Sequence, residues 1–121
     1  RGFYETSVIQ MERGLFDLAT FSIEQSLQLY LKAMLLRLGV DYPATHSLRR
    51  LLDIIARITE DEMMDGLVKI YAVELAALED AYITSRYIVR EFTREEVERL
   101  KEVVDRVMDV VGGVVDRRSS V

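Results

Sequence analysis

One group of side chains that could do chemistry consists of Arg86, Tyr87 and Arg90. Two guanidinium groups four residues apart on a helix can hold one phosphate through paired hydrogen bonds, and a tyrosine beside them can stack on a base. This group therefore predicts a binding site for an anionic ligand, centred on the two arginines. The structural alternative is that Arg86 pairs with Glu79 or Asp80 and that Tyr87 packs at the helix end.

A second group consists of Glu24, Gln28 and Lys32, which are spaced four residues apart and share one stripe of a helix. Because that helix is otherwise apolar, the stripe must meet water, a partner or other polar groups. It is either a narrow solvent-facing strip with a Glu-to-Lys ladder or a ligand-facing strip that brings Lys32 to the edge of the anion site. Gln25 is expected closer to the core, where its amide needs hydrogen-bond partners.

His46 is the single histidine of the chain and the default candidate for acid–base chemistry. It follows the loop that contains Pro43, at the start of a predicted helix. There it is expected to hydrogen-bond a helix end or a neighbouring carboxylate, or to contact the edge of the anion site. With one histidine and no cysteine, a zinc site and a disulfide are not expected. We predict neither a metal nor a cofactor.

Helical periodicity runs through most of the sequence, and no strand pattern appears. Residues 15–38 are apolar on nearly every face, which predicts a central helix surrounded by others, with a break before it at Gly14 and an end at Gly39. A third helix follows over residues 48–58.

Two capping boxes mark later helices. Residues 59–62 predict the start of a fourth helix that reaches about residue 87, with a bend or split at Gly66. Residues 93–96 predict the start of a last helix, which Gly112 and Gly113 should end. We therefore predict an all-α fold, an antiparallel up-and-down bundle of four to five helices in residues 1–113, with a flexible tail over 114–121.

Composition sets outer limits on function. A chain of 121 residues with 50% hydrophobic and 31% charged residues is typical of one globular domain. A net charge of −5 argues against general nucleic-acid binding, and no apolar run reaches the roughly 20 residues of a membrane span. We expect a cytoplasmic protein. A homodimer is predicted because Phe3, Ile9, Phe16, Ile23 and the valine-rich last helix offer more apolar surface than one core absorbs.

Several short motifs carry a family resemblance. Gln25 lies in a long apolar helix that ends in Leu-Lys-Ala-Met-Leu (31–35). Thr-His-Ser-Leu follows at 45–48, and Ala-Tyr-Ile-Thr-Ser-Arg-Tyr at 81–87. In their order and spacing these motifs resemble the HEPN domain, a helical module named for nucleotide binding in higher eukaryotes and prokaryotes. The resemblance covers residues 7–111. It implies a bundle of four or five helices that usually dimerises and often works with a minimal nucleotidyltransferase.

One branch of that family consists of metal-independent ribonucleases, often toxins of toxin–antitoxin pairs, whose motif is an Arg followed four to six residues later by His. Neither Arg86 nor Arg90 is followed by His in that window, and His46 lies earlier in the chain. We therefore expect no ribonuclease activity, and a module that binds a nucleotide or a nucleotidyltransferase partner. The alternatives are a divergent ribonuclease that uses His46 and Arg86, and a homodimeric interaction protein without a ligand.

Overall fold

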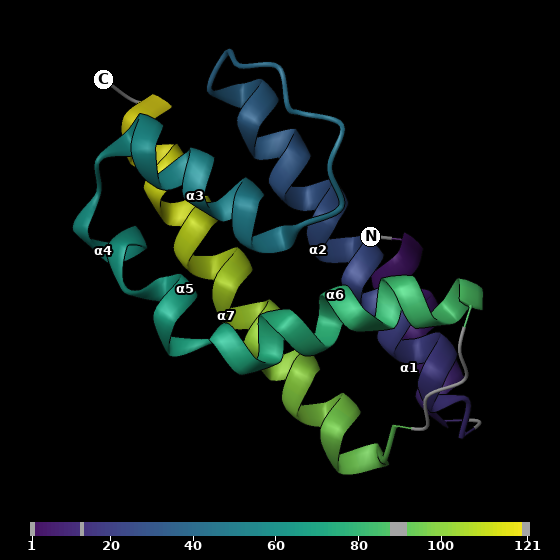
Figure 1. Ribbon diagram of the computed structural model, residues 1–121. Coiled ribbons are helices and arrows are strands. Elements are labelled where there is room, and N and C mark those ends of the chain that lie inside the picture. Colours follow the sequence, from purple (N-terminus) through teal and green to yellow (C-terminus); the bar gives the residue numbers. More distant parts are fainter. Residues whose placement is uncertain (1, 13, 88–91, 120–121) are drawn as a thin grey trace.

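The computed structural model describes residues 2–12, 14–87 and 92–119 (Figure 1), with the side chains of 2–4, 11, 82–87 and 119 outside the description. The described residues form helices and no strand, so the predicted all-α bundle is confirmed. The helices are α1 (Gly2–Glu12), α2 (Phe16–Arg37), α3 (Leu48–Thr59), α4 (Glu62–Asp65), α5 (Leu67–Ile70), α6 (Ala72–Tyr87) and α7 (Arg94–Ser119). Within these ranges no helix has both the length and the apolar character needed to cross a membrane.

Helix α2 is the centre of the bundle, as its apolar sequence predicts. It contacts α1, α3, α6 and α7, and Ile23, Leu27 and Leu31 are at most 1% exposed. Glycines with positive φ lie just outside both of its ends, Gly14 at 75° and Gly39 at 78°. The predicted bounds of 15–38 therefore differ from the observed ones by one residue at each end.

Helices α2 and α7 run in the same direction, which departs from strict up-and-down alternation. Three contacts between the α2 segment and the α7 segment advance together along both: Asp17 with the Phe92 amide, Tyr30 with the Met108 carbonyl, and Arg37 with Asp116. The direction of α2 is therefore repeated in α7, so the bundle is not a strict up-and-down one.

The connection between α2 and α3 explains part of this topology. Instead of turning directly into the next helix, residues 38–47 double back along α2, as the loop at the top of Figure 1 shows. His46 at the end of this loop lies beside Gln28, nine residues before the end of α2. At 1.5 Å per residue the chain has returned by about 14 Å. Helix α3 then begins directly after Ser47, which caps it: the Ser47 hydroxyl accepts the Arg50 amide hydrogen at 3.3 Å.

The predicted start of a fourth helix at Thr59 is wrong by two residues. Helix α3 continues through Thr59, whose hydroxyl donates to the Ile55 carbonyl, and ends at Glu60 in the left-handed region (φ 50°). Asp61 caps α4 instead by accepting the Met63 amide hydrogen at 2.9 Å. Aspartate is a stronger cap than threonine, which accounts for the difference. The split predicted at Gly66 is confirmed, because α4, α5 and α6 are separate helices.

Helix α7 begins as predicted but ends later. Thr93 and Glu96 exchange the two hydrogen bonds of a capping box, at 3.0 and 3.1 Å. The helix then passes through both glycines to Ser119, so the predicted end at Gly112 and Gly113 is wrong. Residues 114–119, predicted as a flexible tail, are helical. Burial of Val114 and Val115 offsets the helix propensity that the two glycines lose.

Gly112 is a point where α7 lies directly against a side chain of α2. A β-carbon built at Gly112 would lie 2.5 Å from the Tyr30 hydroxyl, closer than atoms can approach. That hydroxyl donates to the Met108 carbonyl at 3.2 Å. Because Gly112 has no β-carbon, there is room for the Tyr30 ring to lie across α7.

Candidate functional site

The described part of the chain has a fully buried carboxylate, Glu24, in the middle of α2. Its two oxygens accept hydrogen bonds from the side-chain amides of Gln25 at 2.6 Å and Gln28 at 2.8 Å. Burial raises the pKa of Glu24 from 4.5 to about 7, against the opposing effect of the two amide hydrogen bonds. The negative charge of Glu79 raises this pKa further, and the positive charge of Lys32 lowers it. Near neutral pH the carboxyl therefore exists in both protonation states.

The Gln28 side chain connects this carboxylate to the surface. Its Oε1 accepts a hydrogen bond from Lys32 Nζ at 3.0 Å and lies 3.2 Å from His46 Nδ1. An amide oxygen only accepts hydrogen bonds, so in this arrangement Nδ1 of His46 carries a hydrogen and donates it to Gln28. The ammonium of Lys32 also lies 5.2 Å from the centre of the Tyr42 ring.

Glu79 of α6 holds the start of α3 against this group. Its carboxylate accepts from the Ser47 hydroxyl at 3.3 Å and from Arg49 Nε at 2.8 Å. These bonds fix the residue that follows His46, and with it the end of the returning loop. We call this group of side chains the carboxylate chain; its members are Glu24, Gln28, Lys32, His46 and Glu79.

The structure confirms part of the sequence-based site and corrects part of it. The stripe of Glu24, Gln28 and Lys32 forms, but it is not a solvent-facing strip, because Glu24 is 0% and Gln28 4% exposed. Glu24 and Lys32 are linked through Gln28 rather than as a direct ladder. Gln25 was expected deeper than its neighbours and is instead half-buried, with Glu24 as its partner. Hydrogen bonds from two side-chain amides offset the desolvation cost of burying this carboxylate. The spacing of the residues along the sequence does not reveal these bonds.

Of the predicted ligand-binding residues, the structure brings Lys32 and His46 together. Arg86 and Tyr87 belong to α6, but their side chains lie outside the described residues, as does the whole of Arg90. The expected pairing of Arg86 with Glu79 or Asp80 therefore cannot be followed, although Glu79 already accepts from Ser47 and Arg49. Sequence reasoning considered Glu79 only as a partner of Arg86 and missed its contacts with Ser47 and Arg49 beside His46.

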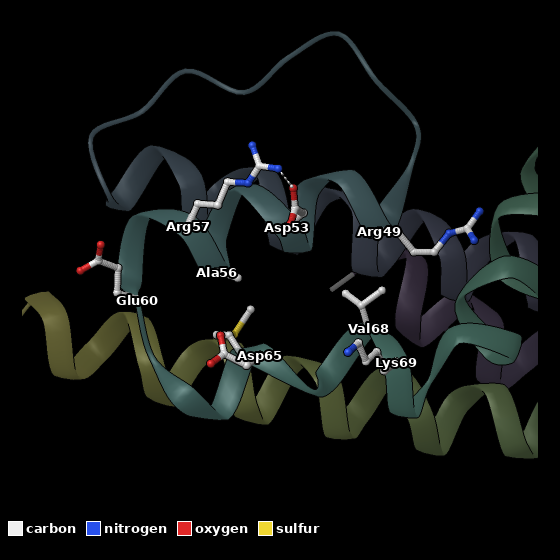
Figure 2. Close-up of a pocket in the computed structure, with 9 residues that line it drawn as sticks. Arg49, Asp53, Ala56, Arg57, Glu60, Asp65, Val68 and Lys69 are labelled. Carbon is white, nitrogen blue, oxygen red and sulfur yellow. Dashed lines mark ion pairs between the residues drawn. The ribbon is translucent and has the colours of Figure 1, made fainter.

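A separate groove of about 760 Å³ lies between α3 and the α4–α5 segment (Figure 2). Apolar side chains, among them Ala56 and Val68, meet a rim of mixed charge. Arg57 on this rim pairs with Asp53 at 3.0 Å, and Arg49 is held by Glu79. The rim has three basic and three acidic residues: Arg49, Arg57, Lys69, Asp53, Glu60 and Asp65. It therefore has no net preference for an anion, and it contains none of the predicted ligand-binding residues.

The described residues contain no group of three or more His, Asp or Glu side chains that could hold a metal ion. Fold and site together define an all-α bundle whose central helix carries a buried carboxyl joined by hydrogen bonds to a lysine and a histidine. A model of the HEPN domain family matches residues 1–114, so the chain belongs to the HEPN family. Searches of curated proteins and of solved structures found no match.

Proposed function

We propose that this chain is a nucleotide-binding or partner-binding HEPN module that holds a phosphate group at Lys32 and His46. The observation that supports the proposal is the contact of both side chains with one oxygen, Gln28 Oε1, at 3.0 and 3.2 Å. An ammonium has three hydrogens, so Lys32 keeps donors for a phosphate while it is bonded to Gln28. A cation and an imidazole held by one buried side chain are in place before an anion arrives, which lowers the entropic cost of binding.

Arg86 and Arg90 are proposed to complete the site, with Tyr87 stacking on the base. Arg86 follows Glu79 by seven residues on α6, and that spacing returns two residues to one side of a helix. Glu79 itself contacts Ser47, the neighbour of His46. The proposed partner is a minimal nucleotidyltransferase in the cytoplasm, whose nucleotide this site would contact.

Calorimetric titration of ATP and GTP tests the site. Lys32→Met and the double variant Arg86→Ala, Arg90→Ala should each weaken binding by tenfold or more relative to wild type, and binding should weaken as salt rises. Lys69→Met is a matched control, because Lys69 is an exposed lysine on α5 with no ion pair among the described residues. Equal binding by all four proteins, or none up to millimolar nucleotide, would contradict the site and leave a module that binds a protein partner alone.

We further propose that the chain is a homodimer, although the surface differs from the predicted one. Ile23 is 1% exposed, the valines of α7 are largely buried, and Phe16 packs partly on the core, so these side chains are not available. Ile9 is 51% exposed, as that prediction requires, and the side chain of Phe3 lies outside the described residues. Instead Leu18, Leu29 and Leu36 of α2 are each at least 50% exposed. Their spacings of 11 and 7 residues keep them within about 20° around the helix axis, so they form one stripe along α2, with Gln25 between Leu18 and Leu29.

Light scattering tests the dimer. We expect about twice the monomer mass of 14.0 kDa for wild type, and dissociation in Leu29→Lys. Val73→Lys is the control, because Val73 is 79% exposed on α6 and outside the stripe. A wild-type mass of 14.0 kDa at high concentration would contradict the proposal.

The ribonuclease alternative is supported by one observation, the orientation of His46. With Nδ1 donating to Gln28, its Nε2 is the nitrogen that could accept a proton from an RNA 2′-hydroxyl. We nevertheless expect no cleavage above background, because His46 does not follow Arg86 or Arg90 in the required window. Incubation of purified protein with single-stranded and structured RNA decides: cleavage that is lost in His46→Ala would establish the alternative.

A further inference from the structure

The carboxylate chain joins a buried proton site to the proposed phosphate site. Glu24 at one end is completely buried, and Lys32 and His46 at the other reach the surface. Gln28 lies between them and contacts all three, donating to Glu24 and accepting from Lys32. A change of charge at Lys32 therefore affects the ionisation of Glu24, because only the Gln28 side chain lies between them.

We propose that an oxyanion binds at Lys32 and His46 together with one proton, and that this proton resides on Glu24. The inference rests on the proposed phosphate site and names how that site is regulated. The proton comes from solvent and joins a carboxylate oxygen of Glu24, so the charge that the anion brings is partly cancelled inside the bundle.

The electrostatic argument starts from Lys32. In the ligand-free protein its positive charge is the coulombic influence that favours ionised Glu24, and Glu79 opposes it. A phosphate on Lys32 cancels that positive charge and adds negative charge at a similar distance. The effect acts on a carboxyl that is completely buried, where charges interact more strongly than in water. The ionised form of Glu24 is then less favoured, so the pKa of Glu24 rises and its carboxylate takes up a proton.

Charged groups on the surrounding elements do not replace Lys32 in this role. The nearest described acid on α6 is Glu79, and Arg49 of α3 is already engaged by that carboxylate. The returning loop contributes His46. On the other two helices packed against α2, described charged side chains such as Glu5 and Glu12 of α1 and Asp105 and Arg106 of α7 are exposed. Among the charged groups described around Glu24, Lys32 is therefore the one that favours its ionised form, beside the larger effect of the amide hydrogen bonds from Gln25 and Gln28.

Hydrogen bonding also allows the neutral acid. A protonated carboxyl has one O–H, which needs an acceptor, whereas both described partners of Glu24 are amide donors. The Gln25 amide is half-buried and can turn to present its oxygen. Gln28 can then keep its bonds to Lys32 and His46, so the phosphate site stays intact while Glu24 becomes neutral.

Calorimetry of ATP binding in two buffers of different ionisation enthalpy at pH 7 counts the protons taken up. Wild type should take up a sizeable fraction of one proton more per ATP than Glu24→Gln. Protons taken up by ATP itself cancel in this comparison. Carbon-13 NMR of the Glu24 carboxyl in wild type, with and without ATP, reports the same protonation directly and does not depend on the folding of a variant.

The outcomes separate the two proposals. Extra proton uptake that disappears in Glu24→Gln, with an NMR shift of Glu24 toward the protonated form, supports the inference. ATP binding with equal proton uptake in wild type and Glu24→Gln, or with an unchanged Glu24 resonance, overturns the inference and leaves the phosphate site standing. Absence of ATP binding in wild type overturns both.

Discussion

Replacing Glu24 by glutamine should change how the stability of the protein depends on pH. The pKa of Glu24 is about 7 in the folded protein, against 4.5 for the unperturbed group. Because the folded-state pKa is raised, the folded protein binds more protons than the unfolded chain between these two values. The contribution of Glu24 to stability is therefore fully present below pH 4.5 and is lost as pH rises through about 7.

The two pKa values set the size of the effect. A difference of about 2.5 between them, at about 1.4 kcal/mol for each pH unit, corresponds to about 3.5 kcal/mol in total. Between pH 5 and pH 8 the part lost is about 2.5 kcal/mol, because the transition has already begun at pH 5. Glu24→Gln cannot ionise and should not lose this free energy. The variant should therefore gain about 2.5 kcal/mol relative to wild type on going from pH 5 to pH 8.

Urea unfolding followed by circular dichroism at both pH values measures this difference at a fixed protein concentration. The comparison is robust because the hydrogen bonds that the variant loses affect its stability at both pH values and largely cancel. Glu98→Gln, at an exposed position on α7, controls for the loss of one negative charge. Parallel pH profiles for wild type and Glu24→Gln would refute the reasoning, since Glu24 would then have an ordinary acidity despite its burial.

Four further predictions concern the bundle, and each is measured by the same unfolding experiment. Gly113→Ala should stabilise the protein by about 0.5–1 kcal/mol through helix propensity. Gly112→Ala should be at least about 1 kcal/mol less stable than Gly113→Ala, because the new β-carbon would displace the Tyr30 hydroxyl 2.5 Å away. Replacing Tyr30 by phenylalanine removes that hydroxyl and should reduce the difference in stability between the two alanine variants. Leu31→Asp, at a position with no exposure, should cost about 4 kcal/mol or more, and a folded variant of wild-type stability would contradict the central place of α2. Thr93→Ala should cost about 1 kcal/mol, and no loss would mean that the capping box contributes nothing.

The sequence allowed the helical fold to be predicted because its signals are local. Apolar periodicity marked α2 to within one residue at each end, and the capping box at Thr93 marked the start of α7. The end of α7 was not predictable from the same kind of signal. Two consecutive glycines normally end a helix, and here the burial of Val114 and the close approach of Tyr30 outweigh that tendency.

The site was predictable only where its residues share one helix. Spacing alone placed Glu24, Gln28 and Lys32 on one stripe, but it could not tell that the stripe descends into the core. The contact of His46 with Gln28 depends on a loop that folds back by about 14 Å, and no residue pattern encodes that path. Glu79 joins the group through tertiary packing of α6, which local periodicity does not report.

The parallel arrangement of α2 and α7 has a consequence for how the chain folds during synthesis. The contacts that join them link residues 75 and 78 positions apart, so they cannot form until α7 has left the ribosome. Until then α1 can pair with α2 locally, while the side of α2 that α7 will cover stays open to water. The nascent chain thus carries an unpaired apolar helix face for most of its synthesis, and completion of α7 is the step that removes this aggregation risk.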